Sequence, residues 1–406
     1  MKLIIKSPVK TSKQNTNYNY AVQVTRLILR LIGVWPIPSN ASIVERIMTR
    51  TQNVICYLLT AFLIVPGLLR IFLKEHEFKS RIRLTAPIIN CGMACLKYIL
   101  LMYHAREVQF CLDQVSQDWN DAVNENDRRI MLSNAKSGRK FAIYSALFMY
   151  IGGLSYRILI PLSKGRILTP MNTTVRVLAC PSYFVFFDGG VSPAYEIIFT
   201  LQIFAGVITY SVRCGIAGLA ALFVMHVCGQ LSIVVDKVHS LDYVPKSNNR
   251  AVMILLADIV ERQNKIKKFL KKVETTLQYV WLAEVTDSAI LVCLSLYYII
   301  MGLENNQFSD VFTMTVMLAS FAFALFTNCY VGQRLTDQSI KVRLMIAASK
   351  WYRFQYKTSR TFVLLMAVSN IPTKISAGKI VEMSLPTFSN IIKSSVAYFN
   401  ILRNFT

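Results

Sequence analysis

Seven stretches of the chain are apolar enough and long enough to cross a lipid bilayer as helices. An α-helix rises about 1.5 Å per residue, so about 20 apolar residues span the hydrocarbon core. The stretches are Thr51–Leu69, Leu84–His104, Phe141–Leu162, Ile197–Val235, Thr276–Leu303, Val311–Gln333 and Ile380–Leu402. The pattern predicts an all-α, polytopic membrane protein with seven transmembrane helices. The fourth stretch exceeds the bilayer thickness, so its helix is expected to continue beyond the membrane.

The cations are unevenly shared between alternate connections. Residues 1–50 and the connections before the third, fifth and seventh stretches hold 32 of the 45 Lys and Arg residues. Short connections rich in Lys and Arg stay in the cytoplasm. This distribution predicts a cytoplasmic N-terminus and, after seven crossings, an extracellular C-terminus.

The same reasoning divides the chain into segments of alternating location. We expect a cytoplasmic N-terminal segment at 1–50, spans one to four at 51–235 with an outer loop at 163–196, a cytoplasmic helical segment at 236–275, spans five and six at 276–333, a cytoplasmic anchor helix at 334–379, and the seventh span with an extracellular C-terminus at 380–406.

The predicted cytoplasmic segments carry apolar residues at helical spacing. In Ala251–Leu277, Met253, Leu256 and Ile259 recur beside a Lys-rich face, and Ile340–Met366 has a similar mixture. One interpretation is a basic helix solvated against lipid headgroups. The other is a helical domain below the membrane that packs several helices together. The sequence leaves both open.

Composition supports the membrane assignment and narrows the function. The hydrophobic share is 54% and the mean hydropathy is +0.42. A net charge of +23 could indicate nucleic acid as a partner, but the topology already accounts for it, so we predict membrane lipid as the contact and no nucleic acid. The four histidines form no metal-spaced pair, and no phosphate loop, dinucleotide fingerprint or HExxH motif occurs. We therefore expect neither an enzyme nor a cofactor.

Charged residues inside the spans are candidates for function, because such groups are costly in a bilayer. Arg157, Glu284 and Asp287 lie near predicted span ends, where we expect their side chains to snorkel towards water. Lys97 and Arg213 lie deeper. Either their helices continue beyond the bilayer, which we favour, or they line an aqueous vestibule.

Two further features concern the outer side and the last span. Asn172 begins the glycosylation sequon Asn172-Thr173-Thr174 in the loop predicted to lie outside, so it is a candidate glycosylation site. The seventh stretch is the most polar of the seven, with Glu382, Lys393 and several Ser, Thr and Asn residues. We expect this helix to face water or protein rather than lipid.

The C-terminal residues resemble those of the insect odorant receptor family. The matching residues are Lys350-Trp351-Tyr352, Ile371-Pro372, Ser376-Ala377-Gly378-Lys379, Ser384, Phe388 and Ser395-Val396-Ala397-Tyr398-Phe399-Asn400-Ile401-Leu402. Ile32-Gly33-Val34-Trp35-Pro36 resembles the family's N-terminal Gly-x-Trp-Pro motif. Ala397 departs from the family's usual Thr or Ser. The short connection between the fourth and fifth spans is unlike the large insertion of the olfactory co-receptor, so the chain is similar to a ligand-tuning receptor.

The resemblance implies an odorant-gated, non-selective cation channel. In such a heterotetramer the tuning subunit assembles with the olfactory co-receptor in the cell membrane, and a sensory-neuron dendrite is the expected site. The last helix would line the pore, with Ser394, Tyr398, Ile401 and Phe405 near one face and a hydrophobic constriction near Ile401 and Phe405.

The same resemblance implies an apolar pocket for a small volatile odorant in the outer half of the membrane. The candidate residues are Ile88, Phe148, Tyr150, Tyr156, Ile197, Thr200, Leu201, Phe204, Met314, Met317 and Phe321.

Three alternatives remain. The related gustatory receptors share the expected fold, but their usual Thr-Tyr-x-x-x-x-Gln ending is missing, since Arg403 stands five residues after Tyr398. A secondary transporter would be expected to show internal repeats, and none is convincing. A G-protein-coupled receptor would require the opposite topology.

Overall fold

The computed structural model describes residues 12–37, 41–76, 78–168, 174–187, 189–245 and 249–405. The predicted glycosylation site, Asn172, lies outside these ranges. Within them the elements are α1 (Ser12–Leu31), α2 (Ile43–Leu73), α3 (Phe78–Tyr103), α4 (Ala105–Asp121), α5 (Glu125–Lys164), β1 (Arg166–Leu168), β2 (Thr174–Arg176), α6 (Ala194–Leu241), α7 (Asn249–Glu304), α8 (Phe308–Ala348), the 3-10 helix η1 (Trp351–Arg353), α9 (Tyr356–Ser369), β3 (Ser376–Ala377), β4 (Val381–Glu382) and α10 (Leu385–Phe405).

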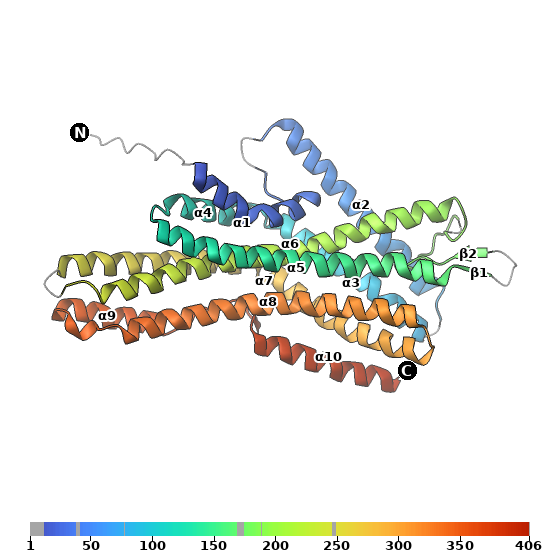
Figure 1. Ribbon diagram of the computed structural model, residues 1–406. Coiled ribbons are helices and arrows are strands. Elements are labelled where there is room, and N and C mark those ends of the chain that lie inside the picture. Colours follow the sequence, from blue (N-terminus) through green and yellow to red (C-terminus); the bar gives the residue numbers. More distant parts are fainter. Residues whose placement is uncertain are drawn as a thin grey trace.

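The long helices α5, α6, α7 and α8 run along one another in an elongated bundle (Figure 1). Among the described residues, α2, α3, α5, α6, α7 and α8 are long and apolar enough to cross a membrane. The predicted all-α membrane fold is therefore confirmed, with six of the seven expected spans meeting this measure. The seventh, α10, has 21 residues and is long enough, but it is not apolar enough to meet this measure, in line with the polar character seen in its sequence.

Helix α6 forms the centre of the bundle. In its most apolar stretch 89% of the residues are buried, against 28% to 44% in the corresponding stretches of the other five membrane-length helices. Apolar residues cover its whole circumference, which is typical of a helix surrounded by protein. Amphipathic α1 contributes to this enclosure, because Val22 and Leu29 are fully buried and the helix packs against α5 and α6.

At the end of the bundle that carries α9, the helices form a packed domain. Leu256 and Ile259 on the first half of α7 are buried, and that half packs with α4, α6 and α8. Polar contacts add to the packing: Asn126 Nδ2 on α5 donates to Asp236 Oδ2 on α6 at 2.8 Å. The contacts favour the helical-domain interpretation of this segment over an isolated solvated helix.

An ion-pair network joins α4, α6 and α7 within this domain, with His226 buried and Lys265 at the surface. His226 Nε2 lies 3.0 Å from Asp118 Oδ2, and Lys265 Nζ lies 2.6 Å from Asp118 Oδ1. Burial raises the pKa of Asp118, but hydrogen bonds and charge attraction from His226 and Lys265 outweigh it and lower the pKa below its ordinary value of 3.8. The ionised carboxylate therefore stabilises the folded state.

Asp118→Asn is expected to lower the thermal stability of the purified receptor at neutral pH. A group with a lowered folded-state pKa stabilises the protein above its ordinary pKa, and that contribution is lost as the pH falls through the lowered value. The melting temperatures of wild type and variant should therefore converge in acid. A difference that stays constant from neutral to acidic pH would contradict this role for the carboxylate.

A short hairpin connects α9 to α10 and fixes where α10 begins. Strands β3 and β4 pair antiparallel, and their turn contains Gly378 and Lys379, both with positive φ, which suits the predicted Gly-containing turn. The hairpin is held to α7 by Gly378 N, which donates to Gln278 O at 2.9 Å. Glu382, expected in the seventh span, lies instead in β4 and pairs with Lys374 at 2.9 Å. Helix α10 begins at Leu385 rather than Ile380, because Ser384 Oγ accepts a hydrogen bond from Thr387 N and caps it.

Candidate functional site

A cavity of about 370 Å³ lies between α3, α5, α6, α7 and α8, with residues 177–181 of the α5–α6 connection forming part of its wall. This volume is in the range of small-molecule sites. Apolar and aromatic side chains make up much of the wall, including Tyr156, Ile160, Leu178, Tyr210, Leu291, Tyr297, Tyr298, Met301, Met314, Met317 and Phe321. Such a wall suits a small, largely apolar ligand.

One charged side chain in this wall is almost fully buried. Arg157 on α5 is 2% exposed. Its Nε donates to Tyr210 Oη at 3.0 Å, and its Nη1 donates to the Gln202 carbonyl oxygen at 2.8 Å and approaches Cys180 Sγ at 3.5 Å. The prediction that Arg157 snorkels to water is wrong, because neutral acceptors inside the bundle hold its guanidinium.

The α5–α6 connection closes over this part of the bundle and is well anchored. Gln202 Nε2 donates to Cys180 O at 2.7 Å, and Tyr183 N donates to Pro66 O at 3.0 Å. Phe184 stacks on Phe187 with ring centroids 4.9 Å apart. These contacts hold the connection in place, and with it residues 177–181 in the wall of the cavity.

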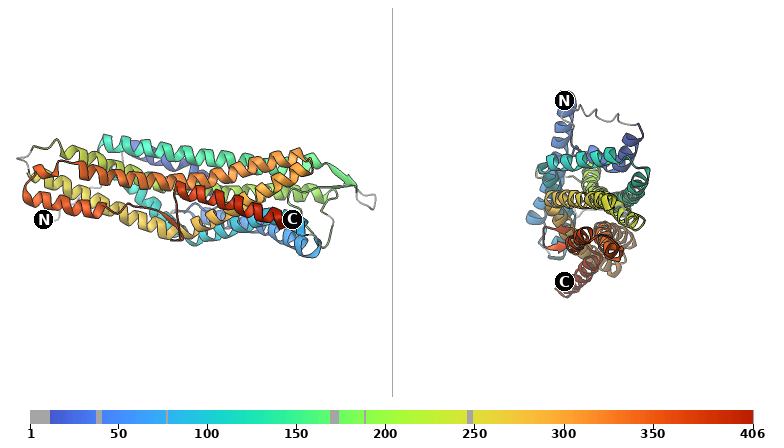
Figure 2. Two further views of the ribbon diagram at one scale, coloured as in Figure 1. Left: turned by 90° about the horizontal axis from the view of Figure 1, so that it is seen from below. Right: turned by 90° about the vertical axis from the view of Figure 1, so that its left-hand side faces the viewer.

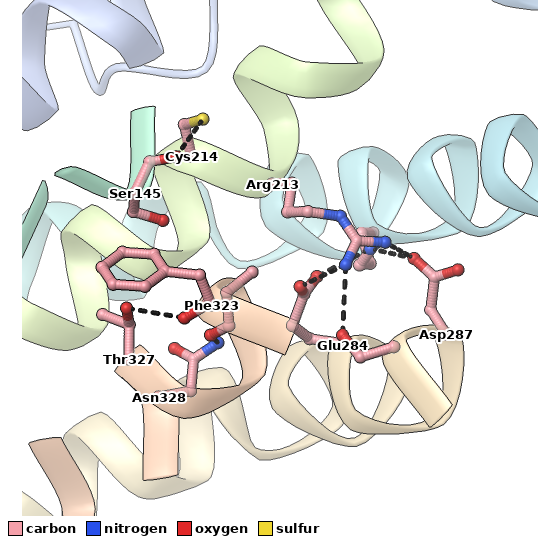
Figure 3. Close-up of polar contacts among 11 residues, drawn as sticks. Ser145, Arg213, Cys214, Glu284, Asp287, Phe323, Thr327 and Asn328 are labelled. Atoms are coloured by element: carbon pink, nitrogen blue, oxygen red, sulfur yellow. Dashed lines mark hydrogen bonds and ion pairs between the residues drawn. The ribbon is translucent and has the colours of Figure 1, made fainter. Parts of the chain in front are cut away.

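Two cations and two carboxylates form a cluster within the bundle. Figure 3 shows three of its members, Arg213, Glu284 and Asp287. Lys97 Nζ on α3 is 2.7 Å from Glu284 Oε2 and 2.6 Å from Asp287 Oδ2 on α7. Arg213 on α6 binds the same two carboxylates, and its Nη1 lies 2.9 Å from Glu284 Oε1. Arg213 Nη1 also donates to Ser288 Oγ at 3.1 Å. All four charged side chains are at most 2% exposed. The formal charges of this charge cluster cancel, which makes its burial tolerable.

The charge cluster corrects the expectations for its members. Glu284 and Asp287 do not snorkel, and Lys97 and Arg213 do not reach water along an extended helix. The cluster borders the cavity, because the Arg213 guanidinium lies 5.1 Å from the ring of Phe321, and Phe321 lines the cavity. Three helices contribute to it, so no local sequence signal could have shown it.

Of the eleven residues predicted to bind odorant, Tyr156, Met314, Met317 and Phe321 line this cavity. The remaining seven are not among its lining residues. Ile197, Thr200 and Phe204 are exposed on the outside of α6, and Leu201 is half-buried beside them. Phe148 stacks on Phe323, Tyr150 hydrogen-bonds Ser211 Oγ, and Ile88 packs near Gly67.

Several residues of the cavity wall were not predicted from the sequence. Arg157 and Tyr210 are the most informative, together with Asn90, Leu291 and Tyr297. The position of Arg157 inside a predicted span could have indicated this site. From the sequence, Arg157 was instead placed at the end of the span.

The candidate pore residues lie on an unpacked face of α10. Ser394, Tyr398 and Ile401 are exposed, whereas Ser395 and Phe399 are buried where the helix packs against α7 and α8. The end-on view in Figure 2 places α10 at the outside of the bundle. The side chain of Phe405 lies outside the described part of the chain.

Residues 77–396 match the family model described as 7tm odorant receptor. The chain belongs to the odorant receptor family. Odorant receptor 33a of Drosophila melanogaster is 22% identical over 179 residues, which cover 44% of this chain and 47% of that protein. Odorant receptor 10 of Aedes albopictus is 21% identical over 239 residues, covering 58% and 62% respectively. The matched stretches thus cover about half to three fifths of these relatives.

Solved structures confirm the fold over nearly the whole length. The insect olfactory receptor OR5 from Machilis hrabei in complex with eugenol superposes with a TM-score of 0.80 at 13% identity, covering 97% of this odorant receptor and all of that chain. The structure of OR5 from Machilis hrabei described without that compound superposes with a TM-score of 0.75 at 14% identity. The chain therefore has the fold of these solved receptors and belongs to a family of membrane receptors, not of enzymes.

Proposed function

We propose that this receptor is the ligand-specificity subunit of an odorant-gated, non-selective cation channel that assembles with the olfactory co-receptor. The observation that carries the proposal is the cavity of about 370 Å³ between five helices of the bundle. It would bind a small volatile, as OR5 from Machilis hrabei does with eugenol. Binding would favour opening to the extent that the open state holds the ligand more tightly.

The proposed orientation places the α9 end in the cytoplasm and the β1–β2 end outside. It rests on the cation distribution, because most Lys and Arg residues belong to segments that the rule keeps inside. In that orientation the cavity lies in the outer half of the membrane, and the packed domain of α4, α7 and α9 is the cytoplasmic anchor. By resemblance, a sensory-neuron dendrite is the proposed location.

The pore is proposed to run along the exposed face of α10. A helix with Ser394, Tyr398 and Ile401 facing away from its own bundle would gain partners from neighbouring subunits in a heterotetramer. The apolar side chain of Ile401 would then form part of a constriction that closes by excluding water.

Ile401→Ala is expected to raise the basal current of the assembled channel, because a smaller side chain widens a hydrophobic constriction and eases its wetting. Whole-cell recording without odorant measures this. Ile380→Ala is the matched control, since Ile380 is also exposed but lies in the turn before α10. Equal basal currents in wild type and both variants would remove Ile401 from the constriction.

Co-expression with the co-receptor tests the proposal as a whole. Excised patches should show odorant-evoked cation current within milliseconds and without G proteins. Silence to a broad volatile panel, from receptor shown to be at the cell surface, would overturn it.

A further inference from the structure

Arg157 is a buried cation in the cavity wall for which no carboxylate partner is found among the described residues. The contrast with Arg213 is direct, because Arg213 sits between two carboxylates. Burying a charge against neutral dipoles alone is unfavourable, so a structure that retains one usually uses it.

The donors of Arg157 are only partly used. Its Nε and Nη1 have acceptors, but within the described part of the chain its Nη2 donates to no oxygen atom. A second polar group of the same wall is also unsatisfied: Tyr297 is 3% exposed, and no hydrogen-bond partner is found for its hydroxyl in the described structure. Arg157 and Tyr297 thus both line this cavity, and each has a donor for which the described structure offers no oxygen acceptor.

The other charges of the wall do not compensate Arg157. Glu75 pairs with Arg70 at 3.4 Å, and Asp310 pairs with Lys164 at 2.9 Å. Each carboxylate thus already has a cation. The described lining has three cations and two carboxylates, so one positive charge remains, and it belongs to the most deeply buried group.

We propose that the preferred ligand of this cavity carries an accepting oxygen, a carbonyl or a carboxylate, that hydrogen-bonds Arg157, while the apolar wall holds its hydrocarbon part. The inference rests on the proposed function and adds the chemical class of the ligand. A carboxylate would also supply the missing counter-charge, and its hydrogen bonds to a guanidinium are among the strongest in proteins. Tyr297 is a second donor available to the same molecule.

The test uses heptanoic acid, methyl hexanoate and nonane, which have equal numbers of non-hydrogen atoms. On the receptor co-expressed with the co-receptor, at least one of the oxygen-bearing compounds should act at a half-maximal concentration about tenfold or more below that of nonane. Comparing the acid with the ester shows whether Arg157 prefers a negatively charged carboxylate or a neutral carbonyl. A lower half-maximal concentration for either compound than for nonane supports the proposal. Nonane equal to or better than both would overturn it.

Two substitutions assign the effect to these side chains. Arg157→Gln should remove most of the advantage of the oxygen-bearing compounds over nonane, and surface labelling reports whether the variant is folded. Because Arg157 also holds Tyr210 and Gln202, this variant could fail to reach the surface, so Tyr297→Phe provides a second test that removes a single unpartnered hydroxyl. An undiminished preference in both Arg157→Gln and Tyr297→Phe would overturn the assignment. If Arg157→Gln does not reach the surface, an undiminished preference in Tyr297→Phe alone would overturn the assignment to these two donors.

The outcome separates this inference from the proposed function. A channel that opens to nonane as readily as to the acid and the ester would contradict only the ligand class. A surface-expressed receptor that stays silent to every compound, including a broad volatile panel, would contradict the proposed function itself.

Discussion

Replacing Arg213 by Met is expected to remove most of the folded receptor from the cell surface. The substitution leaves Glu284 and Asp287 inside the bundle with Lys97 as their only cation, so one negative charge is buried without compensation. Breaking a buried ion pair by removing one partner costs about 3–5 kcal/mol, a large part of the roughly 5–15 kcal/mol by which proteins are stable. Surface labelling and the melting temperature of the purified receptor measure the loss.

A double substitution provides the control for this prediction. Lys97→Met and Glu284→Gln each unbalance the charge cluster, whereas the two together leave the neutral pair of Arg213 and Asp287. The double variant should therefore be closer to wild type than the sum of the two single effects predicts. Losses of stability that add up in the double variant would show that the charges act independently. Near-normal stability of Arg213→Met would contradict the claim that the cluster needs equal numbers of cations and carboxylates.

Gly332→Ala is the second substitution expected to have a large effect. Gly332 on α8 faces the main chain just before α10, where a Cβ would lie 2.2 Å from Met383 O. Because this neighbour is backbone, it cannot rotate away, and the start of α10 must move. Overpacking of this kind costs about 1–3 kcal/mol and occasionally more. We expect a lower melting temperature and a changed basal current in the assembled channel.

Gly92→Ala is the matched control. Gly92 lies within α3, and apart from the adjoining backbone of its own helix no atom of the described structure lies within 4 Å of a Cβ added there. It should behave like wild type in both measurements. If Gly332→Ala also behaves like wild type, the close contact between α8 and the start of α10 does not determine the position of the proposed pore helix.

The helices of this receptor could largely be predicted from hydrophobic patterning. The stretches Thr51–Leu69, Phe141–Leu162 and Thr276–Leu303 all fall inside observed helices. Helices α5 and α7 are longer than their apolar stretches, because residues beyond those stretches pack in the domain at the α9 end. The additional N-terminal residues of α2 are largely exposed. Only the start of the seventh span was wrong, since the hairpin at Gly378 and the Ser384 cap set it by local geometry.

The positions of the site residues could not be predicted in the same way. Helix α6 is apolar on all sides, so its periodicity does not show which face meets the cavity. The predicted face contains Ile197, Thr200 and Phe204, which are exposed, whereas Gln202 and Tyr210 point into the bundle. The charged residues inside the spans were visible in the sequence, but which of them pair depends on how three helices meet.

The central claim is that ligands act in the cavity between α3, α5, α6, α7 and α8. Cysteine labelling during current recording tests it most directly, with Met314→Cys placed in the cavity wall and Cys180→Ser as the background, because Cys180 also lines the cavity. Phe204→Cys in that background is the control, since Phe204 is exposed on the outside of α6. We predict that a thiol reagent reduces the odorant-evoked current of Met314→Cys alone and that odorant slows the reaction. Labelling at position 314 that leaves the response unchanged would contradict the claim.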